Sequence, residues 1–280
     1  MAAMSDYTFS DALGCNMAQL AEMDNQSFAE YYFPIENAPQ TMARYCQNNN
    51  VDLGNTVVMH DGETFVGMSM VATRGKRGYV MGFGIVPEYR GRGAGKAMLA
   101  HTLEVARAAG LIRLQLEVLT QNTHAQRLYE NSGFSVRRDV VTLKIGVDAI
   151  PRHATTAHIT RTDPEQIMDW LLQGQKPIWS RERASLLVVG GEALVISRPG
   201  GATGAMLYQR REDRIQVLAA ALIDRTSAND FAFMLRHVAE GVESVKIHSE
   251  PDDTVLFQVC KDIGFAEEHR LHEMIIELER

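Results

Sequence analysis

The chain has 280 residues, of which 45% are hydrophobic and 22% charged, and its formal net charge is −7. This is the composition of a globular protein, and its acidic balance argues against a nucleic-acid binder, which needs a basic face. The three cysteines, Cys15, Cys46 and Cys260, form no C-x-x-C pair, so no zinc site or disulfide framework is predicted and a reducing cytoplasm is expected. The first ten residues lack the regions of a signal peptide, and the longest apolar run, 217–223, is too short to span a membrane.

The first half alternates helical and strand patterns. Two helices are predicted over residues 16–33 and 38–49, the first ended by Pro34. The Asp61-Gly62 pair between two β-rich runs predicts a hairpin. The elements predicted after it are a strand at 79–86, a helix at 95–109, a strand at 111–119, a helix at 123–132 and a strand at 135–145.

A basic, glycine-rich loop joins the strand at 79–86 to the next helix. Its glycines and cations are Arg90, Gly91, Arg92, Gly93, Gly95 and Lys96. Glycines let the backbone approach a ligand, and the helix N-terminus offers unpaired N–H groups, so a polyphosphate site is predicted. A Walker A loop is excluded because Arg90 replaces its first glycine and Ala97 its hydroxyl residue. A flexible, basic surface turn is the alternative.

A second motif follows the loop. Residues 116–134 have the pattern L-E-V-x-x-x-N-x-x-A-x-x-L-Y-E-x-x-G-F, and residues 90–95 have the pattern R-x-x-G-x-G. Together these patterns resemble the signatures of the GNAT superfamily of acyl-CoA N-acyltransferases, including its members that acetylate a protein N-terminus. The resemblance covers residues 50–145 well and the second half weakly.

The resemblance implies acetyl-CoA as co-substrate and no metal. The strand ending at Val86 and the strand at 111–119 are expected to splay apart and to admit the pantetheine arm between them. The residues implied in binding the co-substrate are Ile85, Val86, Arg90, Gly91, Arg92, Gly93, Ala94, Gly95, Lys96 and Asn122. An N-cap for the following helix is an equal reading of Asn122.

The resemblance also implies the catalytic groups. Tyr129 would be the general acid that protonates the leaving thiolate, and Glu117 the general base for the amine. A core tyrosine and a solvated strand glutamate are the alternatives. Candidate residues of the acceptor pocket are the aromatic residues Phe28, Tyr31, Tyr32 and Phe33, each of which could instead belong to the core.

The second half repeats the order of elements more weakly. The elements predicted there are a helix at 163–173, a hairpin of 185–189 with 192–197, strands at 215–223, 244–248 and 270–278, and helices at 228–239 and 253–262. The halves align at an offset of 131 residues. At that offset Ala221 replaces Arg90, Asp224 replaces Gly93, and Cys260 replaces Tyr129, so we expect a degenerate copy that does not bind acyl-CoA productively.

The predicted fold is therefore α/β (α+β): two tandem GNAT-like domains, each with a mixed, mostly antiparallel central sheet flanked by helices. The domains are a catalytic one at 1–146 and a degenerate one at 158–280, joined by a linker at 147–157. The predicted function is transfer of acetyl from acetyl-CoA to a primary amine of a small molecule, by direct attack in a ternary complex. Acetylation of protein N-termini or lysines, and a non-catalytic acyl-CoA sensor, are the alternatives. We expect no nucleic-acid or membrane partner, and a monomer or homodimer.

Overall fold

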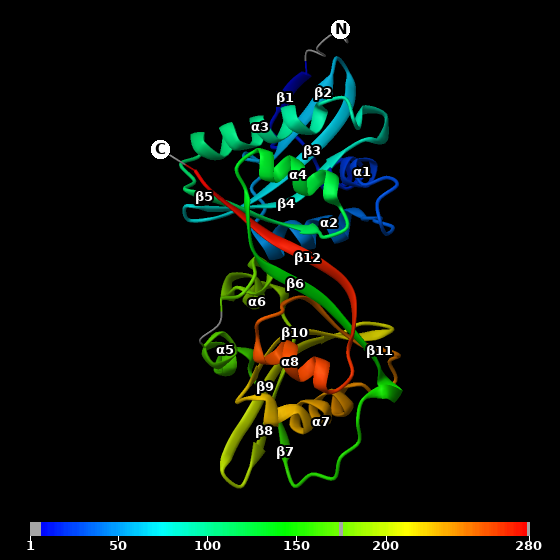
Figure 1. The fold of residues 1–280 in the computed structure, drawn as a ribbon, viewed down its shortest axis with the longest axis vertical. Helices are drawn as coiled ribbons and strands as arrows, with labels where there is room; N and C mark the ends of the chain where they lie inside the picture. The colour runs from blue at the N-terminus through cyan, green and yellow to red at the C-terminus, as the bar shows by residue number, and fades with distance from the viewer. Residues whose placement is uncertain (1–6, 174–175, 279–280) are drawn as a thin grey trace. The chain divides into compact units, whose positions relative to one another are not determined.

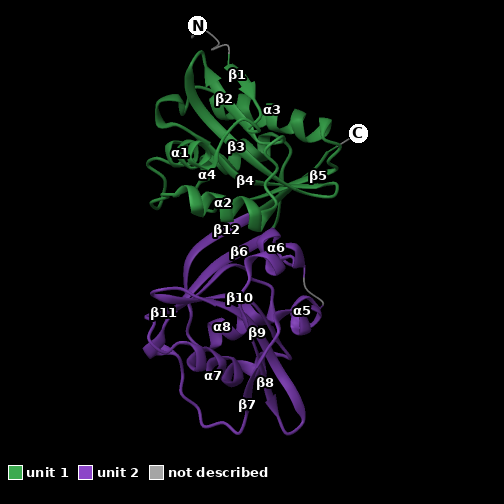
Figure 2. Cartoon of the chain, turned by 180° about the vertical axis from the view of Figure 1, so that it is seen from behind, with its two compact units in different colours: residues 1–137, 273–280 green, residues 138–272 purple. Residues whose placement is uncertain are grey.

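A computed structural model describes residues 7–173 and 176–278, and these form two compact units (Figures 1 and 2). Unit 1 comprises the chain up to Arg137 together with the segment from Glu273 onward, and unit 2 comprises Arg138–His272. Residues 1–6, which belong to the segment assessed for a signal peptide, lie outside the described residues.

Unit 1 contains six strands and four α-helices among its described residues. The strands are β1 (Tyr7–Ser10), β2 (Val57–Asp61), β3 (Thr64–Arg74), β4 (Arg77–Ile85), β5 (Arg113–Leu119) and the end of β12 (Ala266–Glu277), in that order across the sheet. The helices are α1 (Met17–Ser27), α2 (Pro39–Asn49), α3 (Ala94–Ala108) and α4 (Thr123–Asn131). Neighbouring strands from β1 to β4 pair antiparallel, whereas β4 and β5 are parallel.

The sheet of unit 1 is covered on both faces. Val58 packs with residues of α1 and α2, whereas its neighbours Val57 and Met59 pack with Met98 of α3. Because successive side chains of a strand point to opposite faces, α1 and α2 cover one face and α3 covers the other. The hairpin predicted at Asp61-Gly62 is confirmed, with Asp61 paired to Thr64.

The first helix is shorter than predicted. It begins after Asn16, whose side chain accepts hydrogen bonds from the Ala18 and Gln19 N–H groups, and it ends at Ser27 rather than at residue 33. Glu30 has a positive φ of 59°, which an α-helix cannot accommodate. The aromatic residues that follow Ser27 therefore lie in a loop.

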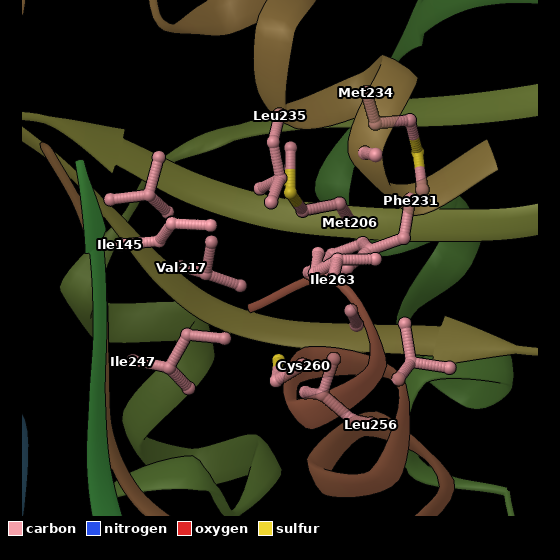
Figure 3. Packing of buried hydrophobic residues seen from close by; sticks show 14 of the residues in the cluster. Ile145, Met206, Val217, Phe231, Met234, Leu235, Ile247, Leu256, Cys260 and Ile263 are labelled. Carbon is pink, nitrogen blue, oxygen red and sulfur yellow. The ribbon is translucent and has the colours of Figure 1, made fainter. Parts of the chain in front are cut away.

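Unit 2 has the same kind of layered sheet. Its strands are the first part of β12, up to His272, the main part of β6 (Ser135–Gly146), β11 (Ser244–Pro251), β10 (Arg214–Leu222), β9 (Gly201–Arg210), β8 (Glu192–Arg198) and β7 (His158–Thr162), in that order. Its α-helices are α5 (Pro164–Leu172), α6 (Arg183–Val189), α7 (Ala228–Val238) and α8 (Val255–Asp262). Figure 3 shows the larger core, where Phe231 and Leu235 of α7 and Cys260 of α8 pack with Val217 of β10.

The predicted hairpin of 185–189 with 192–197 is wrong. Residues 183–189 form α6, which buries Leu186, and β8 pairs instead with β9, a strand that the pattern did not predict. A short apolar run fits a helix and a strand equally, and burial of one side of this run selects the helix.

Each unit contains part of the last strand of the other half of the chain. In unit 1 the Leu278 N–H donates to the Ile112 carbonyl at 2.9 Å, and Met274 and Ile276 are buried in the core formed by β5 and α3. In unit 2, β6 pairs antiparallel with β11. The compact units therefore divide inside β6 and β12, whereas the predicted domains divide at the linker, where the 3-10 helix Val147–Ala149 is the one regular element between β6 and β7.

The internal repeat holds over the later elements and fails before them. When 131 is added to the residue numbers of β6, β5 and α4, the resulting ranges match those of β12, β11 and α8 to within one residue at each end. Residues 86–93, which include the 3-10 helix Pro87–Tyr89, separate β4 from α3, whereas the shorter segment 223–227, which includes the 3-10 helix Arg225–Ser227, separates β10 from α7. Ala221 lies in β10 and therefore does not correspond to Arg90, which lies in the connection after β4.

Candidate functional site

The centre of unit 1 is a split between β4 and β5. The two strands pair in parallel only at Arg77, Gly78 and Tyr79, opposite Arg113, Leu114 and Gln115. Beyond this point β4 continues to Ile85 and β5 continues to Leu119, but the two strands no longer pair with each other. The predicted splay is thus present in the structure.

A bulge in β4 accompanies the split. Val80 pairs with Val71 and Gly82 with Met70, so Met81 is the extra residue on its strand. The Tyr45 hydroxyl of α2 donates to the Met81 carbonyl oxygen at 2.8 Å, which satisfies a backbone group that the sheet leaves unpaired. A bulge bends its strand and increases the local twist, so it turns the end of β4 away from β5.

Beyond the bulge, β4 directs the backbone N–H and C=O groups of alternate residues toward the split. The Val86 N–H donates to the Val66 carbonyl of β3 at 2.9 Å, so it is used within the sheet. Backbone groups of successive strand residues point to alternate sides, and those of Ile85 therefore face the split. Of the two residues predicted to contact the co-substrate through their backbone, the geometry favours Ile85.

The glycine loop forms the mouth of the split. Gly91 and Gly93 have positive φ angles of 73° and 88°. Gly93 is the N-cap of α3, and no side chain caps the first N–H groups of this helix. The loop therefore presents a helix N-terminus with uncapped N–H groups, which is a favourable position for an anion.

The three predicted cations of the loop do not have equivalent positions. The Arg90 guanidinium donates to the carbonyl oxygens of Ile85, Ser27 and Ala29 at 2.8, 3.3 and 2.6 Å, so it ties the loop to β4 and to the end of α1. Arg92 and Lys96 are exposed. The latter two side chains are accordingly the better placed to meet phosphate oxygens, and Arg90 holds the loop in shape.

Two cavities of about 310 Å³ each adjoin the split. The first is lined by the loop, by Ile85 and by the start of α4, and the second by Glu117, Tyr129, Asp24 and Tyr45. The residues that line both are Phe28, Tyr31, Phe83, Asn122 and Ala125. The geometry thus brings five of the predicted co-substrate residues to one cavity and the predicted catalytic pair to the adjoining one. The five are Ile85, Arg90, Gly91, Gly95 and Asn122, whereas Val86, Arg92, Gly93, Ala94 and Lys96 do not line it.

The predicted acceptor aromatics form a cluster at these cavities. Tyr31 is at its centre, with ring centroids 5.3 Å from Phe28, 5.1 Å from Tyr32 and 5.2 Å from Phe33, all in edge-to-face contact. Phe28, Tyr31 and Phe33 line the second cavity, while Tyr32 lines only the first and its hydroxyl donates to the Gln121 carbonyl at 3.4 Å.

Asn122 has the capping role considered for it and also lines both cavities. Its side-chain oxygen accepts from the Ala125 N–H at 3.2 Å and so caps α4. Its side chain also hydrogen-bonds the phenol of Tyr31 and faces both cavities. The cap fixes the start of α4 and thereby the position of Tyr129.

Tyr129 is 6% exposed, and its ring packs against Phe83 and Phe134 with centroids 5.8 and 5.7 Å apart. Burial raises the pKa of Tyr129 above its ordinary value. Its phenol is therefore protonated at neutral pH and can donate a proton. Tyr129 belongs both to the core and to the wall of the second cavity, and its role as general acid stays a prediction.

Glu117 faces the second cavity from β5. Its carboxylate accepts a hydrogen bond from the phenol of Tyr79, and burial together with the charge of Glu117 raises the pKa of Tyr79. Tyr79 belongs to the last residue pair that joins β4 and β5, so Glu117 is held where the strands begin to separate.

Sequence reasoning missed Asp24, Asn37 and Tyr45. Asp24 of α1 is 5% exposed and lines the second cavity, and its Oδ2 accepts from Asn37 Nδ2 at 2.8 Å. Burial raises its pKa to about 6, against a smaller lowering effect of Asn37. The sequence feature that could have identified Asp24 is its spacing along α1. It shares the buried face of this helix with Leu20, Ala21 and Ser27, and a carboxylate on such a face is uncommon.

Unit 2 has a comparable split without the same chemistry. β10 pairs in parallel with β11 only from Arg214 to Val217, and a cavity of about 570 Å³ lies beside the ends of β10 and α8. Cys260, at the position of Tyr129, is fully buried, and burial raises its pKa well above the ordinary value. A buried, protonated thiol is a poor nucleophile.

The described residues contain no group of three or more His, Cys, Asp or Glu side chains that could hold a metal ion. Among the helices described, none combines the length and the apolar character needed to cross a bilayer.

The segment that contains this site resembles a known family. Residues 18–134 match the model of the Acetyltransferase (GNAT) family. The family uses acetyl-CoA as co-substrate, and the matched residues include the split, the loop and both cavities.

Two curated proteins resemble part of the chain. A mycothiol acetyltransferase of Beutenbergia cavernae is 36% identical over 75 residues, which make up 27% of this chain and 25% of that protein. The N-acetyltransferase YycN of Bacillus subtilis, named as uncharacterized, is 39% identical over 66 residues, or 24% of this chain and 42% of that protein. The matched segments thus span less than half the length of these relatives.

Solved structures resemble nearly the whole chain. A GCN5-related N-acetyltransferase from Sphaerobacter thermophilus has a TM-score of 0.72 at 15% identity, covering 98% of this chain and 96% of that one. A tandem GNAT protein from the clavulanic acid biosynthesis pathway has a TM-score of 0.69 at 14% identity, covering 98% and 99%. At these identities the likeness establishes the fold, and that fold is tandem GNAT.

The buried carboxyl of Asp24 predicts a pH dependence of stability. Its folded pKa of about 6 lies above its ordinary value of 3.8, so the native state binds the proton more tightly than the unfolded state. The contribution is fully present below pH 3.8 and is lost as the pH rises through 6, by about 3 kcal/mol. Urea unfolding should therefore show Asp24→Asn gaining stability relative to wild type between pH 4 and pH 7. A stability difference independent of pH would contradict the raised pKa.

Proposed function

We propose that unit 1 is an N-acetyltransferase that moves the acetyl group of acetyl-CoA to a primary amine of a small molecule, by direct attack in a ternary complex. The observation that supports this most strongly is that two cavities at the β4–β5 split share lining residues. One cavity has a helix N-terminus and a glycine loop suited to a pyrophosphate, and the other holds a buried phenol and a carboxylate.

The co-substrate would bind along the first cavity. The uncapped N–H groups at the start of α3 and the exposed Arg92 and Lys96 would meet the pyrophosphate. The backbone of Ile85 would meet the polar groups of the pantetheine arm or the thioester oxygen, because it faces the split. Asn122 borders both cavities and would contact the arm where it reaches the acetyl group.

The chemistry would occur where the cavities join. The amine nitrogen attacks the acetyl carbon, the carbon–sulfur bond breaks, and the products are an amide and free thiol. Tyr129 gives its phenol proton to the departing sulfur, and Glu117 takes a proton from the amine, directly or through water. The protein then regains its starting state when the proton on Glu117 is released and Tyr129 is reprotonated.

The dimensions of the second cavity favour a small acceptor over a polypeptide. It has a volume of about 310 Å³ and is bordered by Phe28, Tyr31 and Phe33. We propose that unit 2 retains the fold without binding acyl-CoA productively, since its connection between β10 and α7, residues 223–227, is shorter than that between β4 and α3 and contains no glycine. A panel of small amines and peptides, followed by thiol release, distinguishes the two acceptor classes.

The loop assignment predicts that Gly93→Asp abolishes acetyl-CoA binding. The carboxylate would stand at the helix N-terminus that is proposed to receive the pyrophosphate, and like charges repel. Titration calorimetry should show at least a hundredfold weaker binding, with the circular dichroism spectrum unchanged. The matched control is Gly75→Asp, because Gly75 also has a positive φ, 59°, and open space around it. Equal affinity of the Gly93 variant and the control would refute the loop assignment.

The proposed acid predicts a separate effect on turnover. Tyr129→Phe keeps the ring packing against Phe83 and Phe134 and removes the proton donor, so kcat should fall by roughly 10²–10⁴-fold while acetyl-CoA affinity stays within about twofold. Tyr208→Phe, which removes a hydroxyl that bonds Glu192 in unit 2, serves as the control. An unchanged kcat for Tyr129→Phe would eliminate Tyr129 as the acid.

A further inference from the structure

The second cavity contains one more carboxylate than the proposed reaction needs. Glu117 enters it from β5 and Asp24 enters it from α1. The reaction assigns a proton acceptor role to Glu117, but it gives Asp24 no task.

Asp24 is a buried acid without a cation beside it. It is 5% exposed, and in the described part of the chain it forms no ion pair; its carboxylate accepts one side-chain hydrogen bond, from Asn37. A buried charge is costly unless it is paired. The raised pKa of Asp24 has the same cause, since desolvation is its largest contribution.

The cavity reaches this carboxylate, since Asp24 is one of its lining residues. A Cβ atom placed on Gly82 would lie 2.8 Å from Met70 Cε, 3.5 Å from Asp24 Oδ1 and 3.8 Å from the ring of Phe28, so Oδ1 lies close to this glycine. The oxygen that Asn37 contacts is Oδ2, and Oδ1 is the one on the side of Gly82. Gly82 also lines the cavity.

The other walls of this cavity are suited to a cation. The rings that line it belong to Phe28, Tyr31, Phe33, Tyr45, Phe83 and Tyr129. The faces of aromatic rings attract ammonium groups, and the attraction increases where water is excluded. Acidic and aromatic side chains together therefore form a cavity selective for positive charge.

A substrate with one ammonium group could not keep both carboxylates, Asp24 and Glu117, paired with positive charge throughout the reaction. The attacking nitrogen must be neutral when it attacks, and its proton passes to Glu117. Asp24 would then face an uncharged substrate at the moment of attack. A second ammonium group, which takes no part in the chemistry, keeps its charge throughout.

We propose that the acceptor is an aliphatic diamine, whose distal ammonium group binds Asp24 while the other amine is acetylated beside Glu117 and Tyr129. This inference rests on the proposed acetyltransferase function and specifies its substrate class. Asp24 is then a residue that determines specificity.

The test compares diamines with monoamines of the same carbon chain. Diaminopropane, diaminobutane and diaminohexane are each measured against the matching monoamine, by thiol release and by mass spectrometry of the product. For the best chain length, wild type should show at least a tenfold higher kcat/KM for the diamine. Asp24→Asn should raise KM for that diamine at least tenfold, with kcat within about threefold, so that the preference for the diamine over the monoamine is lost; Asp24→Glu should restore part of the preference.

Glu22→Gln is the matched control, because it removes an exposed carboxylate from the same helix. Calorimetric titration of the diamine alone gives a second readout that needs no turnover, and its heat of binding should vanish in Asp24→Asn. Equal kcat/KM for diamine and monoamine in wild type would overturn this inference and leave the acetyltransferase proposal standing. Acetyl-CoA binding without acetylation of any amine would instead overturn the proposed function.

Discussion

The parallel pairing of β4 with β5 lasts for three residue pairs, and the position where it stops determines the site. Beyond Tyr79 the strands separate, and Met81 is bulged with its carbonyl bound by Tyr45. The separation leaves the backbone of Ile85 facing a gap instead of a neighbouring strand. It also opens the cavity to which α1 contributes Asp24 and β5 contributes Glu117. The arrangement that we propose to be catalytic is thus a consequence of interrupted sheet pairing.

Unit 2 has a comparable split with different residues around it. β10 and β11 also stop pairing early, and a cavity lies beside the separated ends. The connection from β10 to α7, residues 223–227, is shorter than the one from β4 to α3 and contains no glycine. The largest core of this unit contains the buried Cys260 at the position that Tyr129 has in unit 1.

Local patterns in the sequence were sufficient for much of this structure. The glycine loop, the second motif and the Asp-Gly hairpin depend on neighbouring residues, and each lies where it was expected. The roles of Arg90 and Asp24 depend on distant contacts: Arg90 binds carbonyl groups of Ser27 and Ala29, and Asp24 is buried against Asn37. The last strands could not be assigned from an offset, because pattern and spacing do not reveal that β12 ends beside β5. The helix α6 was missed because its short apolar run is ambiguous.

The central claim is that acetyl-CoA binds in the split of unit 1 and nowhere else. Hydrogen exchange measured with and without acetyl-CoA tests it most directly, because it reports each backbone segment separately. The account predicts slower exchange at residues 85–96 and 122–125, with residues 220–227 unchanged. Protection at 220–227, or no protection at 85–96, would contradict it.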